Sequence, residues 1–181
     1  MNFIIYDLEA SCWAGRPRNM TQEIIEIGAV KMNAYGEIIE EFERTIKPII
    51  HPFLSAYCRE LTHIEQSVID RSSGFVSVVE DFQDWINIFE DDYLLCSWGD
   101  FDRHQLIMDC QLHDMESDWV ENHYINLKKQ FHQYKGWRRA KSLKHVIEIE
   151  ELEFLGEQHR ALSDARNLAQ IFELYIDQWQ Y

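Results

Sequence analysis

Positive charge is scarce in this sequence. Its 181 residues contain 17 Lys and Arg against 32 Asp and Glu, which gives a formal net charge of −15. A protein that coats nucleic acid by bulk attraction needs many cations to neutralise phosphates, so that class is excluded. Any polyanionic partner must be bound at a local site. The cations are in fact concentrated, because residues 128–145 contain seven of the seventeen and no acidic residue.

Paired cysteines, linkers and long apolar runs are also missing. No C-x-x-C motif is present, which argues against a zinc ribbon or a redox motif and favours reduced thiols in a cytoplasmic protein. No apolar run approaches the length that spans a membrane, and neither a basic segment nor a cleavage site precedes the first strand. With 7 Gly, 3 Pro and no linker, residues 1–181 are expected to form a single domain. The four cysteines are Cys12, Cys58, Cys96 and Cys110.

What is present is an alternation of strand and helix patterns. Three strands joined by short turns predict an antiparallel meander, and two more strands follow between helical segments. The predicted fold class is therefore α/β, with a mixed five-stranded sheet flanked by helices. The strands are predicted over residues 2–8, 23–33, 38–48, 93–98 and 124–127.

Local signals add detail to this outline. Gly28 in the second strand predicts a close backbone approach. Thr62 and Glu65 match a capping box, residues 73–89 have helical spacing, and Ser163 is predicted as the N-cap of the last helix.

The first strand carries two acids, Asp7 and Glu9. Residues two apart in a strand share a face, so these carboxylates follow Phe3 and Ile5 on the same side. Two like charges beside apolar side chains repel each other unless a cation or a proton lies between them. The alternative is a strand that simply reaches solvent at its end, and the pair alone does not decide between the two.

Two more acidic sites fit this pair. Asp100 and Asp102 follow the fourth strand, and His159 precedes Asp164 by five residues at a helix start. Taken singly, an acid at a helix start is typically a cap favoured by the helix dipole, and a lone His is typically structural.

Together the sites form an ordered set of D-x-E, D and H-x(4)-D, which resembles the DEDDh 3′-5′ exonucleases and their ribonuclease H-like fold. The sequence is most similar to the branch of enhanced-RNAi and histone-mRNA exonucleases, over nearly its full length. The segments that carry this resemblance include "DLEASCW", "EIIEIGAVKMN", "SWGDFDRHQLIMDCQL" and "HRALSDARNLA".

The resemblance implies a metal-dependent exonuclease that releases nucleoside 5′-monophosphates from single-stranded 3′ ends of RNA or DNA, with RNA favoured. Asp7, Glu9 and Asp164 would hold one Mg²⁺ or Mn²⁺ ion, and Asp7 with Asp102 a second. Two such ions suit phosphodiester hydrolysis, and carboxylate oxygens suit the ions. His159 would act as the general base, since histidine titrates near neutrality.

The resemblance also implies how substrate is held. The family has an aromatic residue directly before the ligand, which selects Asp102 over Asp100, and places Phe101 and Tyr57 against the terminal base.

Upstream phosphates are expected to meet a basic track within residues 128–145, where cations alternate with aromatic residues as on single-strand binding surfaces. The alternative for this segment is a solvated helix whose aromatics face the core. The track residues are Lys135, Arg138, Arg139 and Lys141.

The sequence departs from the family in its last block, which usually reads H-S-G-L-D-D-A-R-N. Here Arg160, Ala161 and Ser163 replace Ser, Gly and the first Asp. The four acidic metal ligands are unchanged, but the replacements could alter the packing of the loop that carries His159. Two other functions remain possible on the same fold. One is a DNA-directed proofreading or repair exonuclease, and the other is a regulatory binding protein without turnover.

Overall fold

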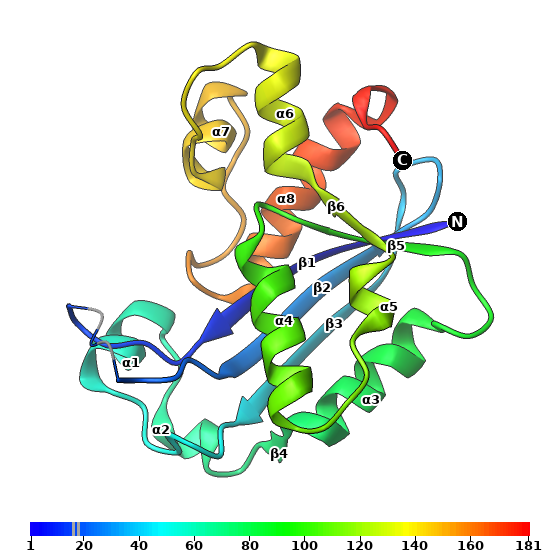
Figure 1. Ribbon diagram of the computed structural model, residues 1–181. Helices are drawn as coiled ribbons and strands as arrows, with labels where there is room; N and C mark the ends of the chain where they lie inside the picture. Colours follow the sequence, from blue (N-terminus) through cyan, green and yellow to red (C-terminus); the bar gives the residue numbers. More distant parts are fainter. Residues whose placement is uncertain (16, 18) are drawn as a thin grey trace.

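The computed structural model describes residues 1–15, 17 and 19–181, and its centre is a mixed β-sheet (Figure 1). The predicted meander is confirmed: β1 (Asn2–Ala10), β2 (Ile24–Met32) and β3 (Ile38–Lys47) pair antiparallel in succession. β5 (Tyr93–Ser97) runs parallel to β1, and β6 (Tyr124–Asn126) runs parallel to β5. The strand order is β4-β3-β2-β1-β5-β6.

The predicted count of five strands was one too low for the described residues. β4 (Ser73–Gly74) pairs parallel with the end of β3, and the helix expected from residue 73 begins at Phe75. A two-residue strand has no readable periodicity of its own, because only its pairing partner defines it.

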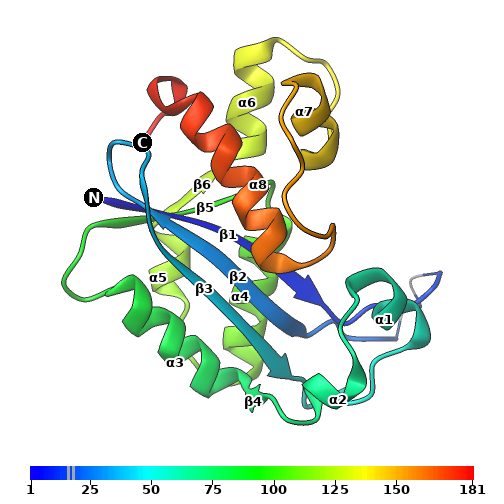
Figure 2. The same ribbon diagram turned by 180° about the vertical axis from the view of Figure 1, so that it is seen from behind.

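Helices cover both faces of the sheet, with α8 on one face and α3 and α4 on the other (Figures 1 and 2). α6 and α7 lie beside α8, while α1 and α2 follow β3. No helix in the part of the chain described here combines the length and hydropathy that a membrane crossing requires. The bounds are α1 (Ala56–Thr62), α2 (Gln66–Ile69), α3 (Phe75–Ile86), α4 (Phe101–Leu112), α5 (Asp118–Glu121), α6 (Leu127–Lys135), α7 (Leu143–Ile149), α8 (Ala161–Leu174) and a 3₁₀ turn at Ile176–Gln178.

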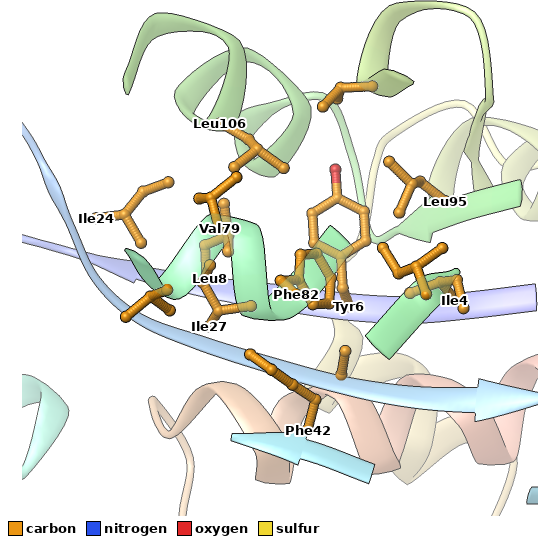
Figure 3. Packing of buried hydrophobic residues seen from close by; sticks show 14 of the residues in the cluster. Ile4, Tyr6, Leu8, Ile24, Ile27, Phe42, Val79, Phe82, Leu95 and Leu106 are labelled. Carbon is orange, nitrogen blue, oxygen red and sulfur yellow. The ribbon is translucent and has the colours of Figure 1, made fainter. Parts of the chain in front are cut away.

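The alternation of β1 divides the core into two layers. Phe3 and Ile5 are buried under α8, whereas Ile4, Tyr6 and Leu8 pack on the opposite face. Asp7 and Glu9 continue the first of these sets, as the sequence predicts, so the acidic pair lies on the α8 side. Figure 3 shows the second layer, in which β1 meets Val79 and Phe82 of α3 and Leu106 of α4.

Gly28 allows α8 to lie directly on β2, as its position in the sequence predicts. A Cβ at this residue would lie 2.0 Å from the backbone nitrogen of Leu162. No side chain fits at that distance, so the contact fixes the height of the first turn of α8 above the sheet.

Both predicted helix caps were wrong, one for a local reason and the other because of a tertiary contact. Thr62 ends α1 instead of starting a helix, and its hydroxyl donates to the Cys58 carbonyl at 2.9 Å. α8 begins at Ala161, ahead of Ser163, because Glu26 of β2 accepts the Ala161 N–H at 2.9 Å. A carboxylate from a distant strand therefore supplies the contact that Ser163 was predicted to make.

Candidate active site

The C-terminal half of β1 has an open edge at which the site is built. β5 pairs with β1 only from Asn2 to Ile5, so the backbone beyond Ile5 is not bonded to that neighbour. Asp102, in the first turn of α4, accepts the Leu8 N–H on Oδ1 at 3.2 Å. The helix start thereby brings a buried carboxylate to the acidic end of β1.

The structure separates Asp102 from its competitor. Asp102 is 5% exposed and bonded to β1, whereas Asp100 lies at the N-cap position, is exposed and makes no capping hydrogen bond with its side chain. Asp102 therefore faces the other acids, and Asp100 faces solvent.

Three side chains from β1 and the start of α8 converge on one point. Ligand atoms of Glu9, His159 and Asp164 all lie within 4.8 Å of one another, which makes them a group able to hold a metal ion. Asp164 also accepts the His159 backbone N–H at 2.9 Å, and His159 has a left-handed backbone with φ of +63°. Oxygen-rich groups of this kind suit hard divalent cations such as Mg²⁺ and Mn²⁺.

The four acids form one electrostatic unit. Burial raises the pKa of Asp7 well above its usual value, and the charges of Asp102, Glu9 and Asp164 raise it further. Burial, followed by the charge of Asp164, raises the pKa of Glu9 to about 8, and burial raises the pKa of Asp102 to about 7. The pKa of Asp164 is also raised by burial. Each carboxylate therefore retains a proton more readily than usual, and a bound cation would relieve the same repulsion.

The two predicted stacking residues line one cavity beside the acids. Phe101 is the first residue of α4 and is 50% exposed, and Tyr57 lies in α1 and is 44% exposed. Both border a cavity of about 800 Å³. The remaining lining includes Cys12, Trp13, Met20, Gln22 and Leu61, which sequence reasoning did not identify.

The aromatic residues of the basic segment turn mostly inward. Phe131 is fully buried, and Trp137 packs on the same core, with the Lys141 ammonium 5.0 Å from its ring centroid. Tyr134 remains 54% exposed. Phe131 and Trp137 therefore follow the alternative prediction for this segment, in which the aromatic side chains face the core.

The predicted track residues fall into two groups. Lys135 is ion-paired with Glu150 at 2.8 Å and donates to the Tyr175 hydroxyl at 2.6 Å, so its charge is already compensated. Arg138, Arg139 and Lys141 instead lie in the basic loop, residues 136–142, and line a hollow of about 560 Å³.

The basic loop is attached to the segment that carries Asp102. The Trp98 indole N–H donates to the Lys141 carbonyl at 3.1 Å, and Trp98 lies directly before the turn into α4. A Cβ at Gly99, in that turn, would lie 3.6 Å from Lys128 Cδ. The loop therefore lies close to the turn that leads to Asp102, although Trp98 and Lys141 are 43 residues apart in sequence.

Sequence reasoning missed a buried acid beside Glu9, which is Glu26. It lies opposite Glu9 in the β1–β2 pairing and is fully buried. The available signal was its position two residues before Gly28 on the same face of β2. The departures in the last block are accommodated: Arg160 pairs with Glu26, and Ser163 packs against Gly156, where a Cβ would lie 2.4 Å from the Ser163 hydroxyl.

The chain is similar in sequence to known proteins over most of its length. A family model described as "Exonuclease" (RNase_T) matches residues 4–172. The chain is 31% identical to ERI1 exoribonuclease 2 of Xenopus laevis over 189 residues, covering 93% of this chain and 27% of that protein. It is 31% identical to human 3′-5′ exoribonuclease 1 over 174 residues, covering 92% of this chain and 50% of that protein.

The fold is also similar to that of a solved nuclease structure. The nuclease domain of 3′hExo, a DEDDh family member bound to rAMP, superposes with a TM-score of 0.91 and 28% identity, covering 97% of this chain and 92% of that one. The chain thus spans between about a quarter and a half of the curated relatives and almost all of this nuclease domain.

Proposed function

This chain belongs to the exonuclease family, with DEDDh enzymes of the ERI1 and 3′hExo branch among its relatives, and from this premise we propose that it is a 3′-5′ exonuclease. Its substrates are single-stranded nucleic-acid 3′ ends, RNA in preference to DNA, and its products are nucleoside 5′-monophosphates. Residues 1–181 form one exonuclease domain that works in the cytoplasm. The observation that carries the proposal is the convergence of Glu9, His159 and Asp164 within 4.8 Å.

The acids have the role of holding metal ions. Asp7, Glu9 and Asp164 hold one Mg²⁺ or Mn²⁺ ion, and Asp7 with Asp102 a second. When bound, two such ions neutralise charge on the phosphoryl group and stabilise the attacking and leaving oxygens. The raised pKa values of Glu9 and Asp102 support this role, because the carboxylates are held together at a cost that a cation offsets.

His159 acts as the general base. It accepts the proton of the attacking water on a ring nitrogen, and later returns it to solvent from its half-buried position. The hydrogen bond from its backbone N–H to Asp164 keeps the ring beside the acids.

The terminal nucleotide occupies the cavity between Tyr57 and Phe101. The two exposed aromatic side chains lie on different helices, so they can take a base between them, and base stacking is tolerant of sequence. RNA is favoured because the two curated relatives described above are exoribonucleases and the 3′hExo nuclease domain binds rAMP.

Upstream nucleotides follow the basic loop. Arg138, Arg139 and Lys141 are the track residues that supply charge, since Lys135 is ion-paired with Glu150. The attachment of this loop to Trp98 places the cations next to the turn that leads to Phe101 and Asp102.

The test incubates the protein with 5′-labelled RNA and DNA oligonucleotides of one sequence, with and without Mn²⁺. A 3′-5′ exonuclease leaves a ladder of labelled products that shorten from the 3′ end, and only with metal. Faster shortening of RNA supports the proposal, and equal rates on DNA favour the repair alternative. Binding without any shortening favours the regulatory binding protein. An Asp164→Asn protein purified in parallel controls for contaminating nucleases.

A further inference from the structure

Glu26 is an acid that the proposed chemistry does not use, although it lies beside Glu9. Its side chain is completely buried, which is costly for a carboxylate unless it is paired. Arg160 pairs with it: Nη2 and Nε donate to Oε1 at 2.7 and 3.1 Å. Oε2 accepts the Ala161 backbone N–H at 2.9 Å. Both carboxylate oxygens are thus committed to the start of α8.

This pair joins the start of α8 to the sheet at a defined place. Gly28, on the same face of β2 as Glu26, is in direct backbone contact with Leu162. Arg160 also reaches Glu43 of β3, with Nη2 and Oε1 3.3 Å apart. The ion pair at Glu26 and the close backbone contact at Gly28 therefore hold the first turn of α8 at two points along β2.

The turn held in this way carries two members of the site. His159 immediately precedes Arg160, and Asp164 follows four residues later in α8. The left-handed backbone of His159, with φ of +63°, is unfavourable for a residue other than glycine and persists only where its surroundings fix it. A bidentate Arg–carboxylate contact on the adjacent residue provides such a restraint.

We propose that the Glu26–Arg160 pair positions His159 and Asp164 against Glu9, and that this chain depends on the pair for its catalytic geometry. Neither residue touches substrate, so both are positioning residues. The inference rests on the proposed function only where turnover is the readout.

Arg166 offers a matched control. It lies further along α8 and also pairs with a strand glutamate: its Nε and Nη2 donate to separate carboxylate oxygens of Glu41 in β3 at 2.7 and 2.5 Å. Removing Arg166 costs α8 its contact with Glu41, and removing Arg160 costs the contacts with Glu26 and Glu43, but only Arg160 adjoins the site. The two Ala variants therefore separate positioning of the site from general anchoring of α8.

The experiment compares Arg160→Ala and Arg166→Ala with the parent in three measurements made well below the melting temperatures. These are kcat and KM on 5′-labelled RNA, Mn²⁺ affinity by calorimetry, and amide hydrogen exchange of residues 159–164 in metal-free protein. Arg160→Ala is expected to lower kcat and Mn²⁺ affinity about 10–100-fold, with KM little changed, and to speed exchange of the His159 amide. Arg166→Ala should change only the melting temperature. Arg160→Lys, which keeps the charge without the bidentate fork, should lie between parent and Arg160→Ala.

Equal behaviour of the two Ala variants, with parental Mn²⁺ affinity and exchange, would overturn the proposal and make the pair purely structural. If Arg160→Ala does not fold, Glu26→Gln answers the same question, because it keeps the side-chain volume and an acceptor for the Ala161 N–H. Absence of turnover in the parent would instead contradict the proposed function. Mn²⁺ affinity and hydrogen exchange would still decide the role of the pair in that case.

Discussion

The backbone N–H of His159 donates to Oδ2 of Asp164 at 2.9 Å, so the proposed base and one proposed metal ligand are joined directly. The Asp164 carboxylate therefore accepts a hydrogen bond at the start of α8 and also belongs to the group that it forms with Glu9 and the His159 ring. Asp164 thus has a structural role and a chemical role, which substitution can separate.

Asp164→Asn is expected to abolish hydrolysis while leaving the metal-free protein equally or more heat-stable. The amide oxygen still accepts the His159 N–H, and one charge is removed from a group of acids that repel one another. Mn²⁺ should raise the melting temperature of the parent far more than that of the variant, because only ligands that bind the folded state stabilise it. A thermal melt with equal metal response in both proteins would remove Asp164 from the ligand set.

His159→Ala is expected to lower turnover about 10²–10⁴-fold, the usual cost of losing a general base, while Mn²⁺ binding persists. Single-turnover rates on labelled RNA measure the first effect, and calorimetry measures the second. Loss of Mn²⁺ affinity together with turnover would instead assign His159 to the ligands, as its place in the 4.8 Å group permits.

The metal-free protein is expected to lose stability as pH rises from about 4.5 to about 8. Burial raises the folded-state pKa of Glu9 from 4.5 to about 8, so the folded state binds more protons than the unfolded state in this window. Stability therefore falls across the window, and Glu9→Gln should flatten that slope. Urea unfolding in EDTA across this pH range measures both proteins. A variant whose pH slope equals that of the parent would show that Glu9 titrates normally.

A triple variant is expected to raise KM for a long oligonucleotide and to weaken the salt dependence of its binding. The three substitutions are Arg138→Ala, Arg139→Ala and Lys141→Ala. Each lost phosphate contact on a single strand changes the slope of log affinity against log salt by about 0.7. Cleavage of a dinucleotide should change little, because it is too short to reach the basic loop.

A matched triple variant controls for net charge in this comparison. Arg44, Lys47 and Arg71 are exposed at the β3–β4 edge of the sheet, away from β6 and the basic loop. Replacing them with Ala therefore removes the same number of charges elsewhere. If both triple variants lose affinity equally, or if dinucleotide cleavage falls as much as that of the long substrate, the basic loop is only a solvated surface.

Strand periodicity predicted much of this site, because a period of two is a local property. It placed Asp7 and Glu9 on one face with Phe3 and Ile5, and the structure puts that face under α8. It could not separate Asp100 from Asp102, since both follow the same strand. The difference arises from a hydrogen bond to Leu8, 94 residues away.

Contacts between distant segments account for what the sequence did not reveal. The start of α8 depends on Glu26, and the charge of Lys135 is compensated by Glu150 on another helix. Nothing in the spacing or composition pairs either acid with its distant partner. The inward packing of Phe131 could not be predicted either, because a cationic segment with interleaved aromatic residues has the same sequence pattern whether the rings face solvent or the core.

Four carboxylates on β1, α4 and α8 are proposed to hold two ions jointly at a nucleic-acid 3′ end. Crystals soaked with Mn²⁺ and adenosine 5′-monophosphate show any such ions through anomalous scattering at the manganese edge. Two peaks about 3.5–4 Å apart are expected. Asp7 should lie between the peaks, with Glu9 and Asp164 at one and Asp102 at the other, and the base between Tyr57 and Phe101. A nucleotide bound there without manganese at these carboxylates would rule out the two-metal site.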